Sequence, residues 1–109
     1  MDIFDIYIAY ILWGSGGKKR PVLILEQQST VIHVFNITTQ YESKSDTVRS
    51  KYFKINEWRQ AGLDKQSYVD TSIIRDLPPA ALERKTPIGK LTENDQQRFL
   101  EFLEVSNYQ

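Results

Sequence analysis

The sequence predicts a mainly β, or α+β, fold: a small, strongly bent barrel of five or six short strands with a short helix and a C-terminal helix. Short segments rich in β-branched and aromatic residues follow one another, separated by glycine, proline or polar residues. The clearest helical periodicity comes last in the chain, which favours a barrel over alternating strands and helices. At 109 residues, the chain is long enough for one modest core, so residues 1–109 are expected to form a single domain.

Three consecutive strands are expected near the start of the chain. Phe4 to Leu12 is β-rich, Val22 to Glu26 is a continuous apolar run, and Thr30 to Thr39 mixes β-branched with polar residues. Together they predict a meander. The apolar stretch Met1 to Trp13 contains two aspartates and lacks a basic n-region, so we interpret it as a strand and expect neither a signal peptide nor a membrane partner.

The middle of the chain predicts shorter elements. They are, in order, a strand over Thr47 to Phe53, a short helix over Ile55 to Ala61 that ends at Gly62, a strand over Ser67 to Ile74 that is broken by Leu77-Pro78-Pro79, and a short returning strand over Ile88 to Leu91.

The C-terminal helix is predicted to begin at Thr92. The hydroxyl of Thr92 can cap it, with Asp95 three residues later as an approximate capping box. Phe99, Phe102 and Leu103 fall on one face at helical spacing. We expect this face to pack on the sheet or on a partner.

Composition restricts the chemistry of any site. There is no cysteine and only one histidine, His33, so no disulfide, thiolate metal site or two-histidine acid-base mechanism can form within one chain. No pair of acidic residues stands at the end of a predicted strand, so we expect no metal and no other cofactor. His33 lies in mid-strand, where a structural role is favoured, and its function stays open. Absence of cysteine is compatible with a reducing cytoplasm.

The segment Gly14 to Pro21 contains three glycines and the basic residues Lys18, Lys19 and Arg20, and it leads directly into an apolar strand. A mobile basic loop hinged on a sheet can hold a phosphate chain, and the planar fork of Arg20 suits phosphate oxygens. An ordinary solvated hairpin loop is the alternative. Residues 18–54 contain seven basic and three acidic residues, which is compatible with one positive face on this neutral chain. A solvated surface of mixed sign is the default alternative.

RNA offers a metal-free reaction for such a site, because its 2′-hydroxyl can attack the neighbouring phosphate. The protein must then supply a proton acceptor, a proton donor and positive charge for the phosphorane. Arg20 stays charged at working pH, so its expected role is electrostatic.

Several segments of the chain also match a known pattern. They are, in order, Asp5-Ile6-Tyr7, the loop leading into Lys19-Arg20-Pro21-Val22-Leu23-Ile24-Leu25, the strand Val31 to Thr38, Ser67-Tyr68-Val69 before Ile74-Arg75-Asp76-Leu77, and Ile88-Gly89-Lys90-Leu91-Thr92. In this order the chain resembles the PemK/MazF toxins of bacterial toxin-antitoxin systems over nearly its whole length. The resemblance implies an SH3-like barrel that forms a homodimer and acts in the cytoplasm as an endoribonuclease.

The resemblance also implies an activity and partners. Such toxins cut single-stranded RNA at short sequences without metal, leaving 2′,3′-cyclic phosphate and 5′-hydroxyl ends. A cognate antitoxin is expected to fold an acidic, disordered segment over the active groove. The loop Gly14 to Lys19 is expected to be poorly ordered in the free protein and to become ordered when RNA or antitoxin binds.

On the family pattern, Arg20 and Thr38 form the catalytic pair. Arg20 would stabilise the phosphorane, and the Thr38 hydroxyl would hold the scissile phosphate in line. The remaining expected RNA contacts are Lys18, Lys19, Thr39 and Arg75. Thr39 competes with Thr38, because only one of two adjacent strand residues points to a given face. For Arg75, a surface ion pair with Asp76 or Asp70 is the alternative.

The chain departs from the family pattern at two places. Its first loop lacks the acidic and glutamine residues of many members, and Ser72-Ile73 stand where an acidic residue and Gln often occur. These departures leave the target sequence undetermined. Two other functions remain open on the same fold: a gyrase poison of the CcdB type and a non-catalytic protein-binding module.

Overall fold

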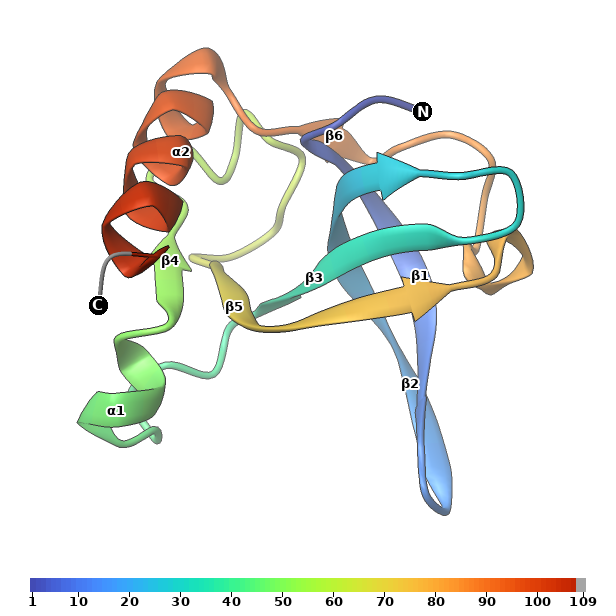
Figure 1. Ribbon diagram of the computed structural model, residues 1–109, viewed down its shortest axis with the longest axis horizontal. Helices are drawn as coiled ribbons and strands as arrows, with labels where there is room; N and C mark the ends of the chain where they lie inside the picture. Colours follow the sequence, from blue (N-terminus) through green and yellow to red (C-terminus); the bar gives the residue numbers. More distant parts are fainter. Residues whose placement is uncertain (108–109) are drawn as a thin grey trace.

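The computed structural model describes residues 1–107 and consists of one curled six-stranded antiparallel sheet with a helix against it (Figure 1). The predicted mainly β fold with a strongly bent sheet and a C-terminal helix is therefore confirmed, and the sheet forms a half-barrel. In chain order the elements are β1 (Asp5–Trp13), β2 (Gly16–Gln27), β3 (Ile32–Thr38), α1 (Asp46–Arg49), β4 (Tyr52–Lys54), β5 (Tyr68–Leu77), the 3-10 helix η1 (Pro79–Ala81), β6 (Gly89–Lys90) and α2 (Glu93–Asn107). Neither described helix has the length and apolar character needed to cross a membrane.

The strand order across the sheet is β4-β5-β3-β2-β1-β6, and every neighbouring pair is antiparallel. The predicted meander of the first three strands is confirmed. At the far edge, β6 pairs with the start of β1 and runs close to the turn at Gly62. A Cβ atom on Gly89 would lie only 1.9 Å from the carbonyl oxygen of Ala61, so this close approach requires glycine.

Both faces of the sheet are buried, which explains the unbroken apolar run in β2. Leu23 belongs to the core under α2, whereas Val22 and Ile24 belong to a second core on the opposite face. In the first core, Phe99 of α2 makes edge-to-face contacts with the rings of Phe4, Phe35 and Phe53. The expected apolar face of α2 is thereby confirmed, since Phe102 and Leu103 also pack against this core. The second core is formed by Tyr7, Ala9, Ile11, Val22, Ile24, Ile32, Val34 and Leu77.

Strand β5 is irregular where it pairs with β3. Val34 pairs with Arg75 and Asn36 pairs with Asp70, so four residues of β5 lie opposite a single residue of β3. The extra residues bend β5 and separate its start from its end. Residues Tyr68 to Asp70 consequently pair with the end of β3, at Asn36 to Thr38, whereas Arg75 pairs further along the sheet with Val34.

The predicted loop over Gly14 to Lys19 is shorter than expected. Gly16 already pairs with Trp13, and the pairing continues through Arg20 opposite Ala9. Only Gly14 and Ser15 form the turn, with Gly14 at a φ of +29°. Glycine and lysine residues carry the backbone donors and acceptors that a two-stranded ladder needs, so the hairpin extends through them. Arg20 therefore sits within a strand.

Two predictions for the middle of the chain are wrong. The strand predicted over residues 47–53 begins only at Tyr52, because Ser45 caps the short helix α1 by accepting a hydrogen bond from the Val48 amide at 3.3 Å. The helix predicted over residues 55–61 is a series of turns instead. Gly62, at which this helix was expected to end, has a left-handed backbone with a φ of +90°.

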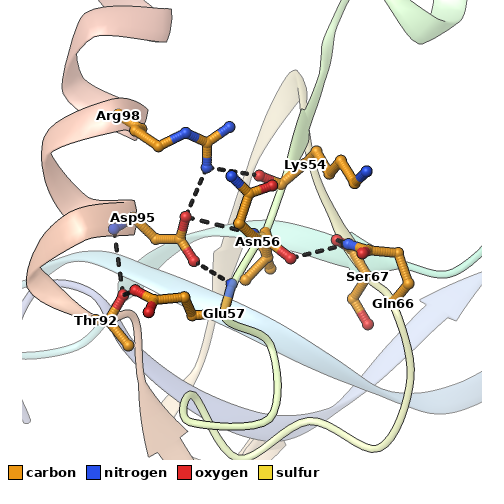
Figure 2. A network of polar contacts seen from close by, with 9 residues as sticks. Lys54, Asn56, Glu57, Gln66, Ser67, Thr92, Asp95 and Arg98 are labelled. Atoms are coloured by element: carbon orange, nitrogen blue, oxygen red, sulfur yellow. Dashed lines mark hydrogen bonds and ion pairs between the residues drawn. The ribbon is translucent and has the colours of Figure 1, made fainter.

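The turns after Ile55 are held by a polar network that reaches across from α2 (Figure 2). The buried carboxylate of Asp95 accepts hydrogen bonds from the backbone amides of Asn56, at 3.3 Å, and Glu57, at 2.8 Å. Thr92 Oγ1 accepts from the Asp95 amide at 3.2 Å, so the predicted cap is confirmed. The carboxylate of Asp95, by contrast, binds the 55–57 segment and Arg98.

Candidate functional site

A small cavity of about 150 Å³ lies between the first half of β2 and the end of β3. Basic side chains and hydroxyl groups line it together. Its residues, which define the Arg20 cavity below, are Lys18, Lys19, Arg20, Pro21, Ile37, Thr38, Thr39, Gln40 and Ser67. Five of the six residues proposed from the sequence for catalysis or RNA binding thus meet at one place, and Arg75 is the exception.

The sheet register explains why Arg20 and Thr38 meet. Val22 pairs with Asn36 across β2 and β3, and continuing this antiparallel register by two residues sets Arg20 opposite Thr38. Residues two apart on a strand share a face, so both side chains lie on the same face as Val22 and Asn36. The sequence positions 20 and 38 become neighbours because the β2–β3 hairpin brings them together.

Thr38 has a defined orientation. Its Oγ1 accepts a hydrogen bond from the amide of Gln40 at 3.0 Å, which leaves the hydroxyl proton free to be donated to a ligand. Thr39 follows the last residue of β3 and is exposed. Both threonines line the cavity, but only Thr38 has its oxygen fixed by the surrounding backbone.

Arg20 is half-buried, and its Nε atom is buried without a hydrogen-bond partner in the part of the chain that the structure describes. A buried guanidinium N–H without an acceptor is costly, because the lost hydration is not replaced. An anionic ligand in the cavity would satisfy this donor.

Lys19 lines the cavity but carries an ion pair. Its Nζ lies 2.8 Å from Oε1 of Glu83, which raises the pKa of Lys19 and lowers that of Glu83. The two side chains are exposed, so this pair contributes little to stability. Lys19 therefore approaches a ligand only with its charge partly balanced by Glu83.

Arg75 lies elsewhere. It lines a separate, largely apolar cavity of about 460 Å³ with Tyr10, Leu12 and Pro78 among its neighbours. Its Nε is also buried and without a partner within residues 1–107.

The alternative ion pairs of Arg75 are not formed either. Asp76 binds Nδ1 of His33 at 2.6 Å, and Asp70 accepts hydrogen bonds from Ser72. His33 is half-buried and does not line the Arg20 cavity.

A group of tyrosines beside the Arg20 cavity was not expected from the sequence. Tyr68 pairs with Thr38 across the sheet, and the ring of Tyr41 stacks on it with centroids 4.3 Å apart and planes at 7°. Arg49 lies over the Tyr41 ring at 5.1 Å and donates hydrogen bonds to the carbonyls of Tyr41 and Glu42. The segment that follows Thr38 is thus held at Gln40 by Thr38 and at Tyr41 and Glu42 by Arg49. Neither the spacing nor the composition of these residues indicated that they would meet.

Within residues 1–107 the structure contains no cluster of three or more histidine, aspartate or glutamate side chains that could hold a metal ion.

Solved structures of other proteins resemble the whole architecture. The chain matches the Mycobacterium tuberculosis toxin MazF-mt6 with a TM-score of 0.68 and 25% sequence identity, and the match covers 90% of each chain. The chain is similar to a MazF toxin. The resemblance to the PemK/MazF toxins seen in the sequence is therefore confirmed. No protein-family model matches the sequence. No curated protein matches it either. The similarity to MazF thus rests on structure.

Proposed function

We propose that the chain is a sequence-specific, metal-independent endoribonuclease toxin that cuts single-stranded RNA. The observation that carries the proposal is the meeting of Arg20 and Thr38 in one cavity on a MazF-like sheet. A guanidinium with an unsatisfied buried donor and a hydroxyl with an available proton are complementary to a phosphate group. Neither group requires a metal ion to bind phosphate oxygens.

In the proposed reaction, the 2′-oxygen of RNA attacks the adjacent phosphorus and the 5′-oxygen leaves. The products are a 2′,3′-cyclic phosphate and a 5′-hydroxyl. Arg20 stabilises the extra negative charge of the phosphorane, and its strand-held position avoids reorganisation during the reaction. The Thr38 hydroxyl donates a hydrogen bond to a phosphate oxygen and holds the phosphate in line. Lys18, Lys19 and Thr39 contact the RNA around this point.

The proposal includes an antitoxin, a homodimer and a cytoplasmic location. A toxin that cuts cellular RNA must be restrained in the cell that makes it. An acidic antitoxin segment would bind the same basic residues as RNA, namely Lys18 and Arg20, and would exclude RNA by competition. Co-expression with the antitoxin would then relieve the growth arrest that the toxin causes alone.

Replacement of Thr38 by valine tests the assigned hydroxyl. Valine keeps the shape of threonine, so we expect the fold to persist while cleavage of a mixed RNA in EDTA falls by about 10²-fold, as for loss of one transition-state donor. Thr86→Val is the matched control and should retain the parent's activity, because Thr86 is exposed and does not line the Arg20 cavity. Rates are measured by gel electrophoresis, with circular dichroism as the check on folding. Equal rates for the parent and Thr38→Val would rule out the assigned role.

Gel electrophoresis of RNA, and of DNA incubated with gyrase, separates the proposed function from the two other functions on this fold. Trapped gyrase-DNA complexes without RNA cleavage would indicate a gyrase poison. Absence of both products would leave a protein-binding module.

A further inference from the structure

The proposed reaction requires a group that accepts the proton of the attacking 2′-hydroxyl. Arg20 is protonated at working pH and has no acceptor atom, and the Thr38 oxygen already accepts the Gln40 amide. The acceptor must therefore come from another residue on the same face of the sheet. This inference rests on the proposed function.

Asp70 is on that face, one row away from Thr38. It pairs with Asn36 of β3 on one side and with Tyr52 of β4 on the other. Thr38 pairs with Tyr68, two residues before Asp70, so the side chains of Thr38 and Asp70 point to the same face. Such diagonal neighbours in an antiparallel sheet lie about 7–8 Å apart. This separation leaves room for a ribose between the phosphate at Thr38 and the carboxylate.

The charges of Arg20 and Asp70 both act on one phenol. Burial raises the pKa of Tyr52, the charge of Asp70 raises it further, and the guanidinium of Arg20 opposes the rise. A single side chain on β4 thus lies within the electrostatic reach of both groups. The carboxylate therefore belongs to the surroundings of the Arg20 cavity.

The carboxylate of Asp70 is held by one oxygen, which leaves its other oxygen for a ligand. Its Oδ1 accepts hydrogen bonds from both the amide, at 2.9 Å, and the hydroxyl of Ser72, whereas Oδ2 has no hydrogen bond from the described residues. Opposite it, Oδ1 of Asn36 is buried and also lacks a partner within residues 1–107. Oδ2 of Asp70 is thus the carboxylate oxygen that can accept the proton of a hydroxyl group, and it lies in the same row as the unpartnered Asn36 Oδ1.

We propose that Asp70 is the catalytic proton acceptor of this chain and that its Oδ2 takes the proton of the RNA 2′-hydroxyl. As this proton moves to Asp70, the 2′-oxygen forms a bond to phosphorus. The bond from phosphorus to the 5′-oxygen breaks, and the leaving oxygen takes a proton from water. Asp70 then returns its proton to solvent.

The test compares the parent protein with Asp70→Asn, in which an amide oxygen can still accept from Ser72. We expect the cleavage rate of a mixed RNA in EDTA to fall by about 10²-fold or more, as for loss of a general base. Binding of an all-2′-deoxy oligonucleotide, measured by fluorescence anisotropy, should be unchanged.

The decline of the parent's rate at acid pH should be absent in Asp70→Asn. Asp70→Glu should recover part of the rate, and Asp76→Asn, on the same strand, should match the parent.

An RNA with sulfur in place of the 5′-bridging oxygen separates the acceptor role from a donor role. Its sulfur leaving group needs no proton, so the cleavage rate of Asp70→Asn should remain low on this substrate. If Asp70 were instead the proton donor to the leaving group, the cleavage rate of Asp70→Asn on this substrate would return to that of the parent.

Each other outcome contradicts a defined part of the proposal. Full activity of Asp70→Asn beside an active parent would overturn the role of Asp70 and leave the nuclease intact. If Asp70→Asn cleaves slowly but its rate still declines at acid pH as the parent's does, Asp70 is a positioning residue and not the proton acceptor. A parent that does not cleave RNA would overturn the proposed function itself. If Asp70→Asn fails to fold, the Asp70→Glu variant and the parent's response to the sulfur substrate decide between these outcomes.

Discussion

Replacement of Arg20 by alanine is expected to lower the rate of RNA cleavage by about 10²–10³-fold, as expected when a preorganised donor to the transition state is removed. The loss follows from the position of the guanidinium in the Arg20 cavity beside Thr38. It should appear mainly in kcat, because the charge that Arg20 meets is largest in the phosphorane. The measurement is the initial rate on a fluorogenic RNA with EDTA present.

The stability of the protein should change little in Arg20→Ala, since Nε makes no hydrogen bond with the described residues that the substitution would break. Arg59→Ala is the matched control, because Arg59 stacks on Trp58 and does not line the Arg20 cavity. Its cleavage rate should equal that of the parent. An Arg20→Ala protein that cuts RNA as fast as Arg59→Ala would remove the electrostatic role assigned to this residue.

Replacement of Asp95 by alanine is expected to cause the largest loss of stability, about 3 kcal/mol in the free energy of unfolding, because two backbone amides lose their shared acceptor. The carboxylate is fully buried and holds the amides of Asn56 and Glu57 against α2 (Figure 2). Without it, these N–H groups are left unsatisfied beneath the helix. The change is measured by urea denaturation followed by circular dichroism.

An exposed aspartate provides the control for this effect. Asp64 lies in the turn before β5, and Asp64→Ala should change the free energy of unfolding by less than about 0.5 kcal/mol, as for most surface substitutions. A similar stability for Asp95→Ala and Asp64→Ala would mean that the network around Asp95 does not hold the 55–57 segment.

The fold was predicted from the sequence where a local pattern determines the structure. The β-rich runs of the first three strands and the Thr92 cap depend on residues close together in the chain, and both are confirmed. The segment over residues 55–61 was predicted wrongly because its amides bind Asp95, almost 40 residues away. Local helix signals contain no information about such a distant acceptor.

Part of the candidate site was also accessible from the sequence. The family resemblance implied that Arg20 and Thr38 would act together, and the structure shows that they line one cavity. Arg75 was assigned to the same site, but the extra residues in β5 carry it to another cavity. Asp70 and the stacked tyrosines were missed, since their proximity depends on the register of three strands. Sequence spacing does not reveal that register.

The central claim is that Arg20 and Thr38 hold a phosphate while the RNA itself supplies the attacking oxygen. The most direct measurement is the chemical nature of the ends produced when purified protein cuts a single-stranded RNA in EDTA. The account predicts 2′,3′-cyclic phosphate and 5′-hydroxyl ends, formed by the parent and lost with Arg20→Ala. Ends with a 3′-hydroxyl and a 5′-phosphate, or cleavage that appears only when a divalent metal is added, would contradict it.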